Sequence, residues 1–134
     1  MLSHISEIRV RYGETDKMGV VYYGTYPLYL EVARTDLMRK HGIVYRNLEE
    51  NGIQMPVVHL ECTYIKPAYY DDVIIINTLV KEIIGSRIVF EYELYNKDNQ
   101  LLNKANTTLI FVNSITGKPC RPPAEILEKF KENI

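Results

Sequence analysis

One acidic side chain stands in a setting that could support chemistry. Asp16 lies in residues 13–19, a loop bounded by glycines, directly before a stretch that we predict to be helical. The first N–H groups of a helix have no intrahelical partners and lie at the positive end of its dipole. They could hold a carbonyl oxygen as negative charge develops on it, while a carboxylate attacks the carbonyl carbon or activates a water. The segment therefore predicts acyl transfer, with Asp16 as nucleophile or general base.

The same residues have a plainer interpretation. An aspartate in such a loop is more often a turn former or a helix cap than a catalyst. The three histidines are scattered, without the spacing of a triad or a metal site. Cys62 and Cys120 lack the spacing of a zinc site or a disulfide framework. We therefore predict neither a metal nor a cofactor, and composition alone leaves both interpretations of Asp16 open.

The predicted elements place this loop between a strand and the longest helix. Apolar and charged residues alternate over residues 7–12, which is typical of a half-buried strand. A helix is expected from about Tyr23 or Tyr26 to His41, because Pro27 is tolerated only in a first turn. Its apolar stripe consists of Tyr26, Leu30, Ala33 and Leu37. The later patterns predict a short helix at 44–50, strands at 56–66, 73–84, 87–96 and 101–113, and a helix at 124–133.

This order of elements predicts an α+β fold in which a mostly antiparallel, five-stranded sheet wraps around one long helix. We expect a single domain of residues 1–134. Two helices cannot cover both faces of such a sheet, so an exposed face or edge should pair with another subunit. A homodimer is therefore expected on burial grounds.

The composition excludes several classes of protein. The 134 residues are 46% hydrophobic and 25% charged, with a formal net charge of -1, which argues against a general nucleic-acid binder. The N-terminus lacks the basic and apolar regions of a signal peptide. The longest strongly apolar stretch, residues 73–80, is too short to span a bilayer. We therefore expect a cytoplasmic protein with no membrane partner.

Residues 11–34 also resemble a known signature. The run RYGETDKMGVVYYGTY at 11–26, continuing to EVAR at 31–34, is similar to the aspartate block of the 4-hydroxybenzoyl-CoA thioesterase family. PAYYDD at 67–72 and GKPCRPP at 117–123 resemble later stretches of that family in the same order. The resemblance implies a hotdog fold and subunits paired edge to edge into a homodimer, often with two dimers in a homotetramer. It also implies active sites at the dimer interface.

The resemblance further implies roles for two residues. Asp16 aligns with the family's essential aspartate, and Tyr23 with the position whose backbone N–H polarises the thioester carbonyl. Many members have histidine where this chain has Tyr23, and asparagine is commoner where it has Thr25. The 4-hydroxybenzoyl enzyme itself has tyrosine at the first of these positions, so activity does not require the histidine. Because of these two differences, the resemblance does not indicate which acyl group the substrate carries.

An acyl-CoA substrate needs local phosphate contacts in a chain of nearly balanced charge. Turns after the predicted strands offer free backbone N–H groups and cations, and the candidates are Ser86, Arg87, Lys118 and Arg121. Ordinary solvated charges would look the same in the sequence. The candidates for the acyl pocket, near the expected interface, are Met55, Pro56 and Val57.

The predicted reaction is hydrolysis of an acyl-CoA thioester to a free acid and CoA. A hotdog dehydratase or hydratase is a second enzyme class, but those usually pair a catalytic acid with a histidine, and the Asp16 segment lacks one. The alternative from another class is a non-catalytic module that binds acyl-CoA or acyl-carrier protein. Such a module would keep the pocket and the phosphate contacts while making Asp16 dispensable.

Overall fold

Five antiparallel strands form the main sheet of the computed structural model, which describes residues 2–132. Their spatial order is β1 (Ser3–Arg9), β4 (Val73–Ile84), β5 (Arg87–Tyr95), β6 (Leu101–Ile110) and β3 (Val57–Tyr64). Two short strands, β2 (Ile53–Gln54) and β7 (Val112–Asn113), pair separately. The predicted α+β fold with a five-stranded antiparallel sheet is confirmed.

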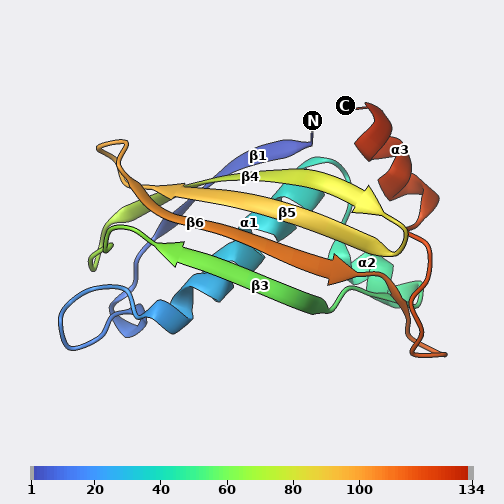
Figure 1. The fold of residues 1–134 in the computed structure, drawn as a ribbon, viewed down its shortest axis with the longest axis horizontal. Helices are drawn as coiled ribbons and strands as arrows, with labels where there is room; N and C mark the ends of the chain where they lie inside the picture. The colour runs from blue at the N-terminus through green and yellow to red at the C-terminus, as the bar shows by residue number, and fades with distance from the viewer. Residues whose placement is uncertain (1, 133–134) are drawn as a thin grey trace.

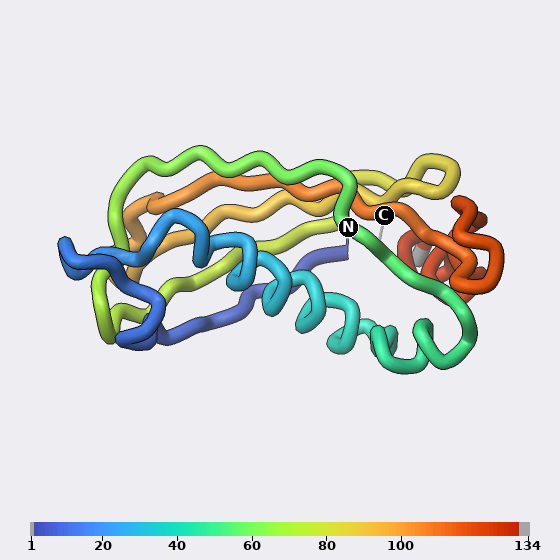
Figure 2. The backbone as a smooth tube through the Cα atoms, turned by 90° about the horizontal axis from the view of Figure 1, so that it is seen from below, coloured from blue at the N-terminus to red at the C-terminus, as the bar shows by residue number. Residues whose placement is uncertain are grey.

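One long helix, α1 (Tyr26–Lys40), runs along the inner face of the sheet (Figure 2). A 3-10 turn, η2 (Tyr23–Thr25), leads directly into it, and Pro27 lies in its first turn, where a missing N–H costs no hydrogen bond. All four residues of the predicted stripe are buried, at 0–3% exposure. Gly42 then adopts a φ of 82°, the left-handed conformation that ends many helices.

The smaller elements close the ends of the sheet. They are the 3-10 turn η1 (Tyr12–Glu14) and the helices α2 (Tyr45–Glu50) and α3 (Ala124–Glu132). The predicted last residue of the C-terminal helix, Asn133, lies outside the described residues. Tyr12, the last apolar position of the strand predicted at 7–12, is 78% exposed, because β1 ends at Arg9 and the chain turns into η1.

Strand β3 is an edge whose side chains stay open on both faces. Helix α1 packs mainly against β1 and β4, at the other side of the sheet, so it does not cover the inner face of β3. Val58, Leu60 and Tyr64 are 43–52% exposed on this strand, and Leu28 and Val32 of α1 are similarly open. An unpaired, apolar edge of this kind is normally covered by another chain.

No helix within residues 2–132 is both long enough and apolar enough to cross a membrane.

Candidate active site

The Asp16 loop is a compact turn held by its own aspartate. The Asp16 N–H donates to the carbonyl of Val20 at 2.9 Å, and Asp16 Oδ1 accepts the N–H of Met18 at 2.9 Å and that of Val20 at 3.4 Å. Gly19 takes a φ of 79°, which the reversal of the chain requires. Asp16 is therefore a turn former, but only through one oxygen, since Oδ2 bonds to none of residues 2–132.

The entrance to helix α1 presents a free backbone donor beside this loop. Tyr22 donates its N–H to the carbonyl of Glu14 at 2.9 Å, and the carbonyl of Tyr23 accepts the hydroxyl of Tyr64 at 3.1 Å. The N–H of Tyr23, the first residue of η2, has no hydrogen-bond partner within residues 2–132. Tyr23 as a whole is 66% exposed. A free N–H at the positive end of a helix favours an oxygen that carries negative charge.

Asp16 and Tyr23 line the same hollow, of about 350 Å³. Its walls are mainly apolar and come from the loop, the start of α1 and the segment after β3. The residues around it are Asp16, Met18, Val20, Val21, Tyr23, Tyr26, Tyr64, Ile65, Lys66 and Pro67. Burial, followed by the nearby Tyr64, raises the pKa of Tyr26 to about 12, so this phenol stays neutral and can donate a hydrogen bond at physiological pH.

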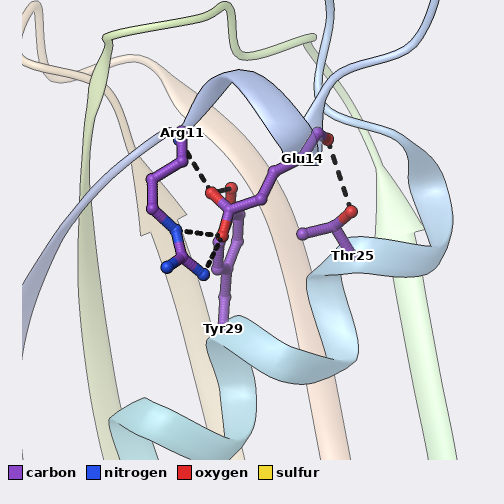
Figure 3. A network of polar contacts seen from close by, with 4 residues as sticks. All are labelled: Arg11, Glu14, Thr25 and Tyr29. Atoms are coloured by element: carbon purple, nitrogen blue, oxygen red, sulfur yellow. Dashed lines mark hydrogen bonds and ion pairs between the residues drawn. The ribbon is translucent and has the colours of Figure 1, made fainter.

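A third residue, Glu14, links this loop to the helix (Figure 3). Its carboxylate accepts the backbone N–H of Arg11 at 2.8 Å, the Arg11 Nε and Nη2 at 3.0 and 2.9 Å, and the hydroxyl of Tyr29 at 2.9 Å. Partial burial opposes ionisation of Glu14, but these hydrogen bonds and the Arg11 charge outweigh it and lower the pKa below its ordinary value of 4.5.

The candidates for substrate binding lie at the other end of the sheet. Ser86 is in the β4–β5 turn and Arg87 is the first residue of β5, not part of the turn as predicted; both line a hollow that also contains Gly85 and Thr108. The turn that holds Lys118 and the segments with Arg121 and Met55–Val57 also lie at this end, whereas the loop at residues 10–22, blue in Figure 1, lies where β3 ends. Strand β3 separates the two groups, and its seven residue steps span about 23 Å.

The cations at this end are available for a ligand. Arg87, Lys118 and Arg121 form no ion pair within residues 2–132 and are exposed, as are Pro56 and Val57, while Ser86 and Met55 are half-buried. The structure thus brings Asp16 together with Tyr23 and places the seven other candidates toward the opposite end of the sheet. It does not bring the two groups together within one chain.

Sequence reasoning missed two residues of the site. Tyr64, at the end of edge strand β3, holds the Tyr23 carbonyl, and Glu14 holds the loop. The i, i+3 spacing of Arg11 and Glu14 is the one sequence signal that could have pointed to Glu14, since the two form an ion pair at 2.9 Å. Nothing in the sequence indicated Tyr29 as the partner fifteen residues away, because that contact depends on how the loop folds back on α1.

Comparison with known proteins gives the family to which this fold belongs. Residues 10–130 match the thioesterase-like superfamily. The acyl-CoA thioester hydrolase YbgC of Escherichia coli O6:H1 is 33% identical over 125 residues, which are 93% of each chain.

Solved structures agree with this match. The DHNA-CoA thioesterase of Staphylococcus aureus is 36% identical, with a TM-score of 0.94 over 99% of this chain and 91% of that one. An asparagine-for-aspartate mutant of 4-hydroxybenzoyl-CoA thioesterase, in complex with 4-hydroxybenzoyl-CoA, is 25% identical, with a TM-score of 0.87 over 96% of this chain and 99% of that one.

The chain therefore belongs to the thioesterase-like superfamily. The predicted family resemblance, hotdog fold and enzyme class of thioester hydrolase are confirmed.

Proposed function

We propose that this protein hydrolyses an acyl-CoA thioester, with Asp16 as the catalytic carboxylate and the N–H of Tyr23 as the donor to the thioester oxygen. The observation that carries the proposal is their convergence on one hollow, with Asp16 Oδ2 and the Tyr23 N–H both free of partners within residues 2–132. A thioester bound there would have its carbonyl oxygen on the helix entrance and its carbonyl carbon facing the carboxylate.

Two routes use this geometry. In one, Asp16 Oδ2 bonds to the carbonyl carbon, the C–S bond breaks, and CoA leaves as a thiolate. Water then cleaves the resulting anhydride, releasing the acid and restoring Asp16. In the other, Asp16 takes a proton from a water that attacks the carbon directly, and that proton goes on to the departing thiolate. An ordinary thiol has a pKa near 8.5, so it is a good leaving group and either route needs only modest assistance.

The active assembly in this proposal is a homodimer formed through β3, and two dimers can stack into a homotetramer. The edge of β3 is unpaired and its apolar side chains are exposed. Antiparallel pairing of β3 with the β3 of a second copy about a two-fold axis at its midpoint would place Val57 of one chain beside Tyr64 of the other. The partner's phosphate-binding end would then reach the Asp16 hollow, which completes the site across the interface.

The experiment is hydrolysis of an acyl-CoA panel, followed by the release of free thiol. Because similar proteins are named for DHNA-CoA and 4-hydroxybenzoyl-CoA, the panel includes both, together with short and long aliphatic acyl-CoAs. Wild type should turn over, and Asp16→Asn should lower kcat about a hundredfold or more, which corresponds to about 2.7 kcal/mol of transition-state stabilisation.

The matched control is Asp98→Asn, an exposed aspartate in the β5–β6 turn, which should leave kcat unchanged. Equal activity of wild type and Asp16→Asn would refute the role of Asp16. Tight binding of acyl-CoA without turnover by wild type would favour a non-catalytic binding module instead.

A further inference from the structure

Glu14 accepts more hydrogen bonds than a surface carboxylate needs. Four donors converge on it, three from Arg11 and one from Tyr29 of helix α1 (Figure 3). The Arg11 side chain is 83% exposed, whereas the Glu14 side chain is only 14% exposed. An exposed ion pair contributes little to stability on its own. The Tyr29 hydroxyl is different, because Tyr29 is only 3% exposed and belongs to the helix rather than to the loop.

The backbone of the same residue reaches the other side of the site. The Glu14 carbonyl accepts the N–H of Tyr22 at 2.9 Å and the hydroxyl of Thr25 at 3.4 Å. Asp16 follows Glu14 by two residues, and Tyr23 follows Tyr22 directly. Glu14 therefore lies in the segment that bears the Asp16 carboxylate and is hydrogen-bonded to the segment that bears the free N–H of Tyr23.

The tip of the loop is exposed at Lys17 and Met18, the latter at 79%. Apart from Glu14, the loop is held by the hydrogen bonds of its own Asp16 turn and by two isolated bridges, Thr15–Val21 and Val20–Tyr69. Those bridges hold the end of the loop at Val20 and Val21, whereas Glu14 holds its beginning. Reacting groups must be held within about 0.5 Å of their productive positions, so both ends of the loop need a fixed support.

We propose that Glu14 is a positioning residue, which sets the separation between the Asp16 carboxylate and the Tyr23 N–H, and that the Tyr29 hydroxyl is its anchor on the helix. This inference rests on the proposed function of Asp16 and Tyr23. Arg11 orients the Glu14 carboxylate from the solvent side, leaving Oε1 directed at Tyr29. A displacement of about 1 Å between reacting groups can cost a hundredfold in rate, so the anchor should act on kcat.

The test removes the anchor and leaves the rest of the network. Tyr29→Phe deletes one hydroxyl and keeps the buried ring, so kcat should fall about tenfold to a hundredfold while KM stays within about twofold. The matched control is Tyr92→Phe, which deletes another buried tyrosine hydroxyl, bonded to Thr107 at 2.6 Å in the middle of the sheet. This control should lower the melting temperature to a similar extent without lowering kcat.

A second comparison separates positioning from a loss of folded protein. In an Asp16→Asn background, Tyr29→Phe should cause no further loss of the residual rate, because the carboxylate that it positions is absent. Loss by the same factor in both backgrounds, or an unchanged kcat in the single variant, would overturn the proposal. Glu14→Gln, which keeps an acceptor for Tyr29, should lose less activity than Glu14→Ala.

An inactive wild type would refute the proposed function, but the positioning of the loop by Glu14 and Tyr29 could still be tested. Amide hydrogen exchange of residues 15–23 should then be faster in Tyr29→Phe than in wild type, while exchange in β5 stays unchanged. Equal exchange rates of the loop in wild type and Tyr29→Phe would refute the positioning role independently of any activity.

Discussion

Mixed dimers offer the sharpest test of how the active site is assembled. The loop with Asp16 lies at one end of the sheet, and the segments with Arg87, Lys118 and Arg121 lie at the other. None of these three cations forms an ion pair within residues 2–132. If each site combines the carboxylate of one chain with the cations of its partner, two inactive chains should complement each other. One chain carries Asp16→Asn, and the other carries alanine at all three cations.

The expected recovery follows from the symmetry. Random re-pairing of the two chains in equal amounts makes about half of the dimers mixed, and each mixed dimer has one intact site of two. About a quarter of the wild-type activity should therefore return. Each lost hydrogen bond to a phosphate should cost about 1.5 kcal/mol, so the triple alanine chain alone should lose well over a hundredfold in kcat/KM.

The assay is thiol release at a substrate concentration below KM, before and after the two chains are mixed in urea and refolded together. Each variant refolded alone is the control and should stay inactive. Sites built within single chains would give no recovery at all, because every chain in the mixture would lack either the carboxylate or the cations. That outcome would refute both the cross-subunit site and the β3 interface that creates it.

Three further predictions concern stability and assembly. Leu37→Ala, at a fully buried position of α1, should lower the free energy of unfolding by about 2–5 kcal/mol in urea, whereas the exposed Leu28→Ala should change it little. Leu60→Glu on the open edge should shift the protein from dimer to monomer in size-exclusion chromatography, and Ile115→Glu, at a turn position 91% exposed, should not. The lowered pKa of Glu14 means that its ionised form stabilises the fold fully above pH 4.5 and less as the pH falls through the folded-state pKa. The difference in unfolding free energy between wild type and Glu14→Gln should thus stay constant above about pH 6 and become smaller in acid. A difference that became larger in acid would contradict this prediction.

Much of the fold could be predicted because its signals are local. Alternation along residues 87–96 indicated β5, in which Ile88, Phe90 and Leu94 are buried at 0–1% exposure. The 3.6-residue stripe of α1 and the proline in its first turn fixed the helix to within a few residues. These patterns depend only on which side chains must leave water and on which backbone positions lack an N–H. The Asp16 loop was found for the same reason, since its glycines and its place before a helix are properties of neighbouring residues.

The arrangement of the site was decided only in three dimensions. The strand order β1-β4-β5-β6-β3 makes β3 an edge, and no local pattern distinguishes an edge strand with apolar residues from a central one. The path of the chain places the phosphate candidates toward the end of the sheet where β3 begins and the Asp16 loop where β3 ends. The contact between Glu14 and Tyr29 needs the loop to fold back on α1, just as Tyr12 is exposed because the chain turns away after β1. Sequence determined which groups this protein has for chemistry; long-range packing decided which of them meet, because contact between distant residues depends on the path of the whole chain.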